Sequence, residues 1–256
     1  MFILLLAVPL VAYGDWMDYM SWRISSDDIL AVCIYEPEDE ELKSNVEYLV
    51  DPTMTAVMEW ENRLMSYTNS PAFDMEYYYI TSIEYEGKTY RDFLHCNVNI
   101  SFWEERVEDA GSNTLGVTWN QGRMMGTDIS IIEIYPIITK TLPVTVESGT
   151  ILTPDDIDKI NRIEKLPIPQ DGIYSIALHE FGHAIGIGHY CDVMGGAQYE
   201  SVMIPQFDAL NSKLSISEYD LATVYHKYGK DGWTDNDTNP FRYGSGGLFS
   251  YDTRCT

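Results

Sequence analysis

Short apolar runs and alternating polar positions predict a series of strands in the first part of the chain. Residues 29–35 are apolar throughout, which is typical of a buried strand. Residues 128–135 alternate Ile129 and Ile131 with polar neighbours, which is typical of a strand with one buried face. We expect further strands over 77–84, 97–103 and 115–119, and an acidic loop over 36–41.

A helical period begins after residue 51. Pro52 suits the first position of a helix that starts near Asp51, because proline has no N–H to leave unpaired there. Apolar residues then recur at helical spacing, and we expect this stripe to face the core: Val57, Trp60, Leu64 and Tyr67.

Two more helices are expected in the second half of the chain, over about 173–186 and about 217–228. The first is largely apolar and therefore buried. At the start of the second, Ser217 and Asp220 form a capping pair, and Gly229 is a stop signal at its end.

The segment 136–171 contains a further helix start, Thr153-Pro154-Asp155-Asp156. Its acids suit the positive end of a helix dipole, and calcium binding is the alternative. The tail 231–256 is rich in Gly, Asp, Asn and aromatic residues, and we expect it to be irregular.

The helix expected over 173–186 carries the sequence H-E-x-x-H-x-x-G-x-x-H, which begins at His179. His179 and His183 lie one turn apart on one helix face, so both imidazoles can reach one metal ion. Glu180 is rotated by about a quarter turn, so its carboxylate flanks the metal and can reach a bound water. Gly186 ends the helix, and the chain returns His189 as the third ligand. Three neutral histidines leave one open position, as expected of a catalytic zinc site.

The alternative is a helix whose histidines simply face solvent. It fits poorly, because buried histidines need partners and the surrounding residues are apolar. These residues are Ile176, Ala177, Ala184, Ile185 and Ile187.

On these residues the chain resembles the metzincin metallopeptidases, and among them the matrixins. The family also has a methionine turn beneath the zinc, and residues 201–207 are similar to its matrixin form, S-x-M-x-P-x-aromatic, with Met203 at the methionine. The resemblance implies an α+β, zincin-like fold: a twisted five-stranded mixed sheet with an antiparallel edge strand, a long N-terminal helix, the active-site helix and a C-terminal helix.

The resemblance also implies where a peptide substrate binds. Residues 115–118 occupy the place of the antiparallel edge strand above the cleft, where substrate would add as an extra strand. Pro205 and Phe207 would wall the pocket for the side chain that follows the scissile bond, which implies a preference for an apolar residue. The substrate-binding candidates are Leu115, Gly116, Val117, Pro205 and Phe207.

Some positions depart from the family pattern. Residue 190 is Tyr where matrixins usually have Ser, and Pro205 stands where some metzincins have a Tyr ligand. His95 is the only histidine between 90 and 135, so we expect one zinc and no structural second ion. No cysteine-switch segment is present, so latency is not indicated.

Length and charge bound the remaining interpretation. The 256 residues, 45% of them hydrophobic, are enough for one large domain, which we place at 15–256. A net charge of −24 argues against nucleic acid as a partner, since phosphates demand basic surface. Residues 2–13 are apolar but too short to span a bilayer. With the rest of 1–14 they predict a signal peptide or short anchor, a buried strand being the alternative.

Four cysteines suit two disulfides in an exported protein. The sequence permits three pairings, and we favour Cys33 with Cys96 and Cys191 with Cys255, because the first two lie on strands expected to be neighbours.

The sequence therefore predicts a secreted, monomeric zinc endopeptidase with one catalytic zinc, no indicated calcium, a protein or peptide substrate and no membrane span. The alternatives are an inactive metzincin-like binding protein and a structural surface protein with a zinc site. Glu180 is the expected general base, and Met203 an apolar floor beneath the histidines.

Overall fold

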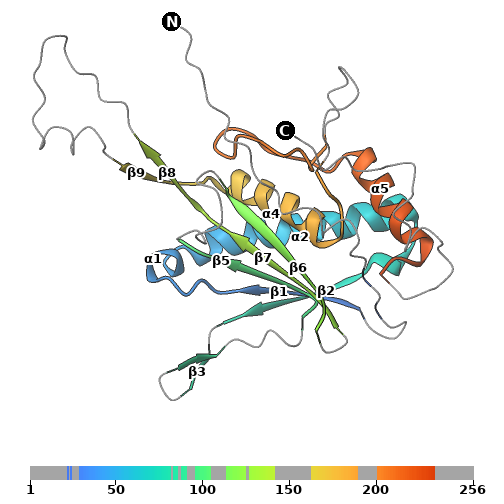
Figure 1. Ribbon diagram of the computed structural model, residues 1–256, viewed down its shortest axis with the longest axis horizontal. Helices are drawn as coiled ribbons and strands as arrows, with labels where there is room; N and C mark the ends of the chain where they lie inside the picture. The colour runs from blue at the N-terminus through green and yellow to red at the C-terminus, as the bar shows by residue number, and fades with distance from the viewer. Residues whose placement is uncertain are drawn as a thin grey trace, which may run out of the picture.

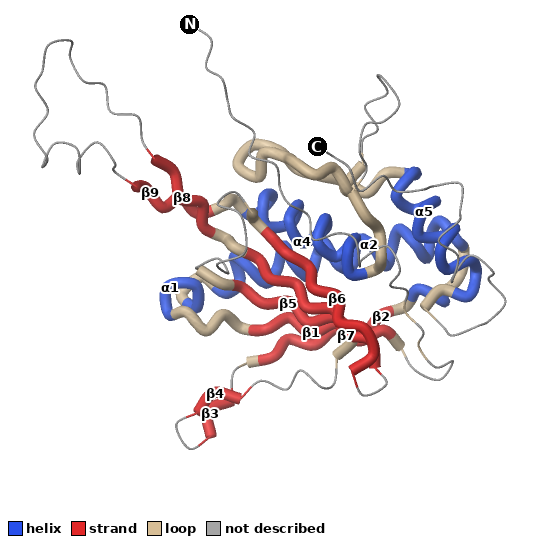
Figure 2. Tube along the Cα trace, viewed as in Figure 1, coloured by secondary structure: helices blue, strands red, loops and turns tan. Residues whose placement is uncertain are grey.

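The computed structural model describes residues 22, 24, 29–81, 83–85, 88–90, 96–104, 114–124, 127–141, 163–189 and 201–233. They form an α+β fold in which a mixed sheet is packed against helices (Figures 1 and 2). The coarse fold class predicted from the sequence is confirmed.

The main sheet has five strands in the order β2-β1-β5-β7-β6. Four of them run parallel, and β6 at one edge runs antiparallel to β7. The antiparallel edge strand is thus where the sequence predicted it. The strands are β1 (Leu30–Tyr35), β2 (Met75–Ile80), β5 (Val98–Phe102), β6 (Gly116–Met124) and β7 (Thr127–Ile134).

Two small antiparallel pairs complete the described strands. One joins β3 (Ile83–Tyr85) to β4 (Lys88–Tyr90), and the other joins β8 (Ile137–Thr141) to β9 (Ile163–Pro167). The second pair leads directly into the helix that carries the histidines.

The long helices are α2 (Val46–Thr68), α4 (Gln170–Ala184) and α5 (Glu218–Tyr228). A short helix, α1 (Glu40–Lys43), begins inside the acidic loop expected over 36–41, so that loop ends earlier than predicted. Two short 3-10 helices lie at Pro71–Phe73 and Gly229–Asp231. Figure 1 shows α2 and α4 side by side on one face of the sheet. No described helix is long and apolar enough to cross a membrane.

The core lies between the sheet and these helices. Val32 and Ile34 of β1 and Trp60 of α2 are fully buried within it. The Trp60 indole also donates a hydrogen bond of 2.8 Å to the main-chain oxygen of Leu178 in α4. This bond satisfies a buried polar group and fixes one long helix against the other.

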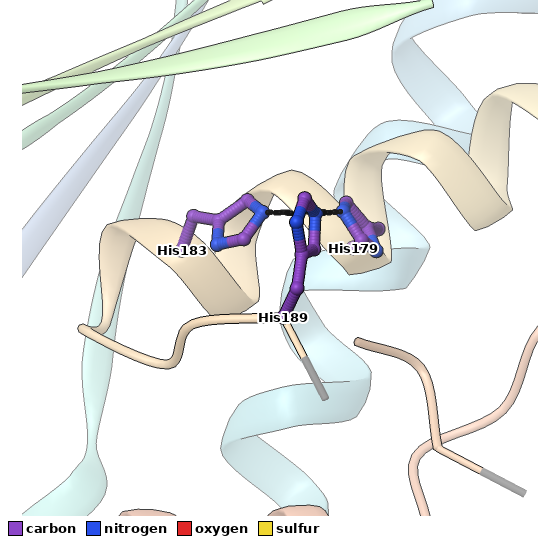
Figure 3. Close-up of side chains that lie close together, drawn as sticks. All are labelled: His179, His183 and His189. Atoms are coloured by element: carbon purple, nitrogen blue, oxygen red, sulfur yellow. Dashed lines mark hydrogen bonds between the residues drawn. The ribbon is translucent and has the colours of Figure 1, made fainter. Parts of the chain in front are cut away.

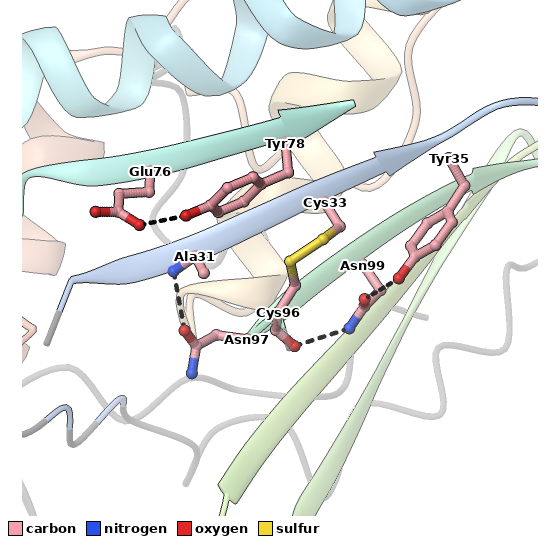
Figure 4. The surroundings of a disulfide bond; sticks show 8 residues. All are labelled: Ala31, Cys33, Tyr35, Glu76, Tyr78, Cys96, Asn97 and Asn99. Carbon is pink, nitrogen blue, oxygen red and sulfur yellow. Dashed lines mark hydrogen bonds between the residues drawn. A yellow bond between two sulfur atoms is a disulfide. The ribbon is translucent and has the colours of Figure 1, made fainter. Parts of the chain in front are cut away.

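The opposite face of β1 carries a disulfide between Cys33 and Cys96, which joins residues 63 apart in sequence (Figure 4). It packs beside Tyr35, whose hydroxyl donates to Asn99 in β5 at 3.0 Å. The predicted Cys33–Cys96 pairing is confirmed. Side chains of β1 point alternately to the two faces of the sheet, so this short strand contributes residues to the core on one face and to the disulfide on the other.

The start of α2 differs from the prediction. The helix begins at Val46, so Pro52 lies inside it and not at its first position. An interior proline costs about 3 kcal/mol. The additional turn offsets this cost because Leu49 is buried and the Tyr48 hydroxyl donates to the main-chain oxygen of Ile168 at 3.0 Å.

The predicted stripe on α2 is correct for Val57, Trp60 and Leu64, which are fully buried, but wrong for Tyr67, which is 41% exposed. Tyr67 lies near the end of the helix and packs edge-on against Tyr225 of α5. Helical spacing alone predicts that Tyr67 faces the core, but the contact with Tyr225 covers only part of the side chain.

Two strand predictions were wrong in extent. The strand expected over 77–84 is interrupted, because β2 stays paired with β1 only as far as the partners Tyr35 and Ile80. β6 continues beyond residue 119 to Met124, since its ladder with β7 extends through the polar residues that follow. Several other predictions lie outside the described residues: the segment 1–14, His95, the helix start at 153–156, Tyr190, the Cys191–Cys255 pairing and the tail from 234.

Candidate metal centre

Helix α4 and the turn that ends it bring the three motif histidines together. Gly186 has φ +88°, a left-handed conformation that glycine adopts without strain. Its N–H donates to the oxygen of His183 at 2.9 Å, and the N–H of Ile187 donates to the oxygen of Gly182 at 2.9 Å. This pair of bonds is a Schellman motif, so the predicted helix stop at Gly186 is confirmed.

Three distant side chains bind the last carbonyl group of α4 and the two carbonyl groups that follow it. Trp22 donates to Ala184 at 3.0 Å, Tyr228 donates to Ile185 at 2.9 Å, and Lys227 donates to Gly186 at 2.8 Å. The lysine also places positive charge at the negative end of the helix dipole. The turn that leads to His189 is therefore fixed by tertiary contacts as well as by its own backbone.

The imidazoles of His179, His183 and His189 meet at their Nε2 atoms (Figure 3). The Nε2 atom of His179 lies 3.0 Å from that of His189 and 3.1 Å from that of His183. The third separation, between His183 and His189, is 3.1 Å. All three predicted ligands are brought together, and they are the one such cluster among the described residues.

The ring protons of His179 and His183 point away from the cluster. Nδ1 of His179 lies 2.8 Å from the main-chain oxygen of Val202, and Nδ1 of His183 lies 2.7 Å from that of Ile187. A carbonyl oxygen only accepts, so each Nδ1 carries the proton of its neutral ring. The two Nε2 atoms therefore direct lone pairs toward each other, and such an arrangement could hold a metal ion between them.

Burial keeps the three rings neutral. It lowers the pKa of His179 to about 4 and that of His189 to about 3. The pKa of His183 lies well below its usual value, because the ring is buried and faces the other two histidines. Unprotonated histidines are the form that binds a metal ion.

The spacing of the three nitrogens fits a small metal ion. Ligands of a tetrahedral zinc with bonds of about 2.0–2.1 Å lie roughly 3.3 Å from each other. The observed separations of 3.0–3.1 Å are close to this value. The residues could hold a metal ion, and three protein ligands leave a further coordination position open.

Glu180 lies beside the cluster and is not one of its members. Its side chain is buried, and this burial raises the pKa of the carboxyl to about 7. The hydroxyl of Thr118 in β6 lies 2.7 Å from Oε2 of Glu180. This hydrogen bond lowers the pKa of Glu180 and so opposes the effect of burial.

Met203 lies fully buried against α4. A Cβ atom added to Gly182 would stand 2.3 Å from the Met203 sulfur, so only glycine lets the methionine approach the helix this closely. Met203 is not part of the histidine cluster, and its packing against the helix agrees with the role of an apolar floor.

Asp220 of α5 connects the segment around Met203 to α5 by hydrogen bonds. The predicted capping pair is confirmed, since Ser217 and Asp220 exchange hydrogen bonds at the start of α5. The same carboxylate also accepts from the Ser201 hydroxyl at 2.6 Å and from the N–H of Val202 at 3.1 Å. The carbonyl of Val202 accepts from His179, so Asp220 supports a ligand through one intervening residue.

The substrate-binding candidates lie on two sides of the centre. The Phe207 ring centroid is 6.2 Å from that of His179. Gly116 faces Glu180, because an added Cβ would stand 2.7 Å from its Cγ. Leu115 packs against the core just before β6, Val117 is half-buried in that strand, and Pro205 is half-buried in the loop after Met203.

Sequence reasoning missed Thr118 and the second role of Asp220. The alternation of β6 places Gly116 and Thr118 on one face, which the sequence could indicate. It could not indicate that this face meets Glu180. No protein-family model matches the chain, and no curated protein matches its sequence.

Proposed function

We propose that this protein is a zinc-dependent endopeptidase of the metzincin type, with a zincin-like fold. The observation that carries the proposal is the convergence of three neutral histidines through Nε2 atoms about 3 Å apart, with the buried carboxylate of Glu180 beside them. His179 and His183 are buried, and His189 is half-buried. Two further features support the proposal. Met203 packs against the same helix, and the edge strand β6 runs antiparallel to β7.

A zinc ion held by His179, His183 and His189 would polarise the scissile carbonyl and acidify the attacking water. Glu180 takes a proton from that water as its oxygen bonds to the carbonyl carbon. It passes the proton to the leaving nitrogen as the C–N bond breaks, which yields a carboxylic acid and an amine. A pKa of about 7 suits a group that must accept and release a proton near neutral pH.

The substrate in this proposal is a peptide in extended conformation. β6 is the last strand of the main sheet, so its outer edge has no strand partner among the described residues. An extended peptide could pair with that edge and pass over Glu180. Phe207, close to His179, would then contact the side chain after the scissile bond, which favours an apolar residue there.

Secretion is part of the same proposal. The Cys33–Cys96 disulfide supports it, since disulfides persist mainly in oxidising compartments. The rival functions are an inactive binding protein and a structural zinc protein. A structural site is normally closed by four protein ligands, whereas the described cluster contains three.

The test combines metal analysis with peptide cleavage by the wild type, Glu180→Gln and Glu180→Ala. We expect one zinc per chain in all three proteins. Cleavage should fall by about a hundredfold or more in both variants, because only the general base is lost. Zinc binding without cleavage by the wild type would favour the structural or binding role. Equal cleavage by the wild type and the variants would refute the assignment of Glu180.

A further inference from the structure

The carboxylate of Glu180 lies against strand β6, between two residues that share one face of that strand. Thr118 is 1% exposed, and its hydroxyl lies 2.7 Å from Oε2 of Glu180. Gly116 precedes it by two positions, where an added Cβ would stand 2.8 Å from Oε1. Any larger residue at 116 would therefore displace the carboxylate.

The Thr118 hydroxyl also reaches the backbone of the helix. It lies 2.9 Å from the main-chain oxygen of Glu180, so one side chain contacts both the carboxylate and the peptide group of the same residue. Such a pair of contacts restricts the side-chain rotation of Glu180 and fixes the distance between β6 and α4. A buried hydroxyl with these partners is costly to remove, because the carboxylate would lose its donor.

We propose that Thr118 is the positioning residue for Glu180, and that it holds the carboxylate in place for proton transfer from the strand that receives the substrate. This inference rests on the proposed peptidase function. With Oε2 held by Thr118, Oε1 is the atom that takes the proton from water and returns it to the leaving nitrogen. Because substrate pairs with β6, the same strand sets the position of the peptide and of the base.

The test is a set of matched substitutions at Thr118. Thr118→Val keeps the shape of the side chain and removes the hydroxyl, whereas Thr118→Ser keeps the hydroxyl. We expect kcat to fall about ten- to a hundredfold in Thr118→Val, since small displacements of a catalytic group have effects of this size. KM and zinc affinity should stay within about twofold of the wild type, and Thr118→Ser should recover most of kcat.

Thr53→Val is the matched control. Thr53 is a fully buried threonine of α2 whose hydroxyl donates to the main-chain oxygen of Leu49 at 2.8 Å, outside the metal cluster. Loss of the Thr53 hydroxyl should lower the melting temperature of the protein and leave kcat unchanged. If Thr118→Val does not fold or loses zinc, Thr118→Ser and Thr118→Ala make the same comparison, because they differ only in the hydroxyl.

A double-mutant cycle separates positioning from a structural role. In a Glu180→Gln background, Thr118→Val should cause little further loss, because the base that it positions is absent. Equal fractional losses in both backgrounds, or a wild-type kcat in Thr118→Val, would overturn the inference. If the wild type cleaved no peptide while it bound zinc, the proposed function would fail instead, so the two failures are distinguishable.

Discussion

The candidate metal centre is built from two kinds of region. The candidate ligands and Glu180 come from one short stretch, 179–189, in which a helix and its terminal turn set every spacing. The groups that hold them come from distant parts of the chain: Thr118 in β6, Val202 in a loop and Asp220 in α5. The local helix and turn bring the three histidines and Glu180 together, whereas tertiary contacts fix the orientation of their side chains. Substitution of a ligand should therefore abolish metal binding, and substitution of a supporting group should only weaken it.

The largest effect is expected from His183→Ala, which removes one of three ligands. Zinc content should fall from one per chain to near zero, and peptide cleavage should be lost with it. His226→Gln is the control, since His226 lies on α5 outside the cluster and should keep both properties. Full occupancy of His183→Ala would show that the three histidines do not form the metal site.

Asp220→Ala tests the supporting region. Its carboxylate accepts from Ser201, Val202 and Ser217, so we expect a loss of about 3–4 kcal/mol in the free energy of unfolding. Zinc affinity should fall about tenfold, because the Val202 carbonyl that orients His179 loses its anchor.

Asp208→Ala is the matched control for Asp220→Ala. Asp208 is an exposed aspartate that accepts hydrogen bonds from Leu210 and Asn211. Its removal should cost about 1 kcal/mol and leave zinc affinity unchanged. Equal zinc affinity in Asp220→Ala and the wild type would show that the remote groups do not support the ligands.

The stability of the metal-free protein should fall as pH is lowered. The three histidines have lowered pKa values, so as the pH falls from 6.5 toward about 4.5 the unfolded chain binds up to three protons that the native chain does not. Glu180, with its pKa raised to about 7, binds one proton in the native state and opposes the trend. The balance of at most two protons predicts a loss of about 2 kcal/mol per pH unit.

Urea unfolding at pH 6.5 and 5.5 measures this slope. In Glu180→Gln the opposing contribution disappears, and the slope should become steeper by about 1.4 kcal/mol per pH unit. Stability that rose on acidification would contradict the buried, neutral state of the histidines.

The smallest effect is expected from Met203→Leu. The two side chains have similar volumes, so the change should cost at most about 1.5 kcal/mol in unfolding free energy and leave zinc in place. Gly182→Ala is the informative comparison, because its new Cβ would collide with the Met203 sulfur. Loss of zinc from Met203→Leu would mean that the methionine does more than fill space.

The contrast between the two regions also explains what the sequence could predict. Helical spacing and the glycine requirement at Gly186 are local, and they correctly predicted that the three histidines lie together. Pro52 and Tyr67 were misplaced because their positions depend on what packs beside them. Thr118 was missed for the same reason, since alternation along β6 assigns a face but does not identify the helix residue opposite it.

X-ray absorption at the zinc edge tests the central claim most directly. An open site of three histidines predicts three nitrogen neighbours at about 2.0–2.1 Å, with the remaining position occupied by oxygen from water. The spectrum of Glu180→Gln should be nearly the same, because Glu180 is not a member of the histidine cluster. A sulfur neighbour at about 2.3 Å, or a fourth protein nitrogen, would contradict an open catalytic centre built from 179–189.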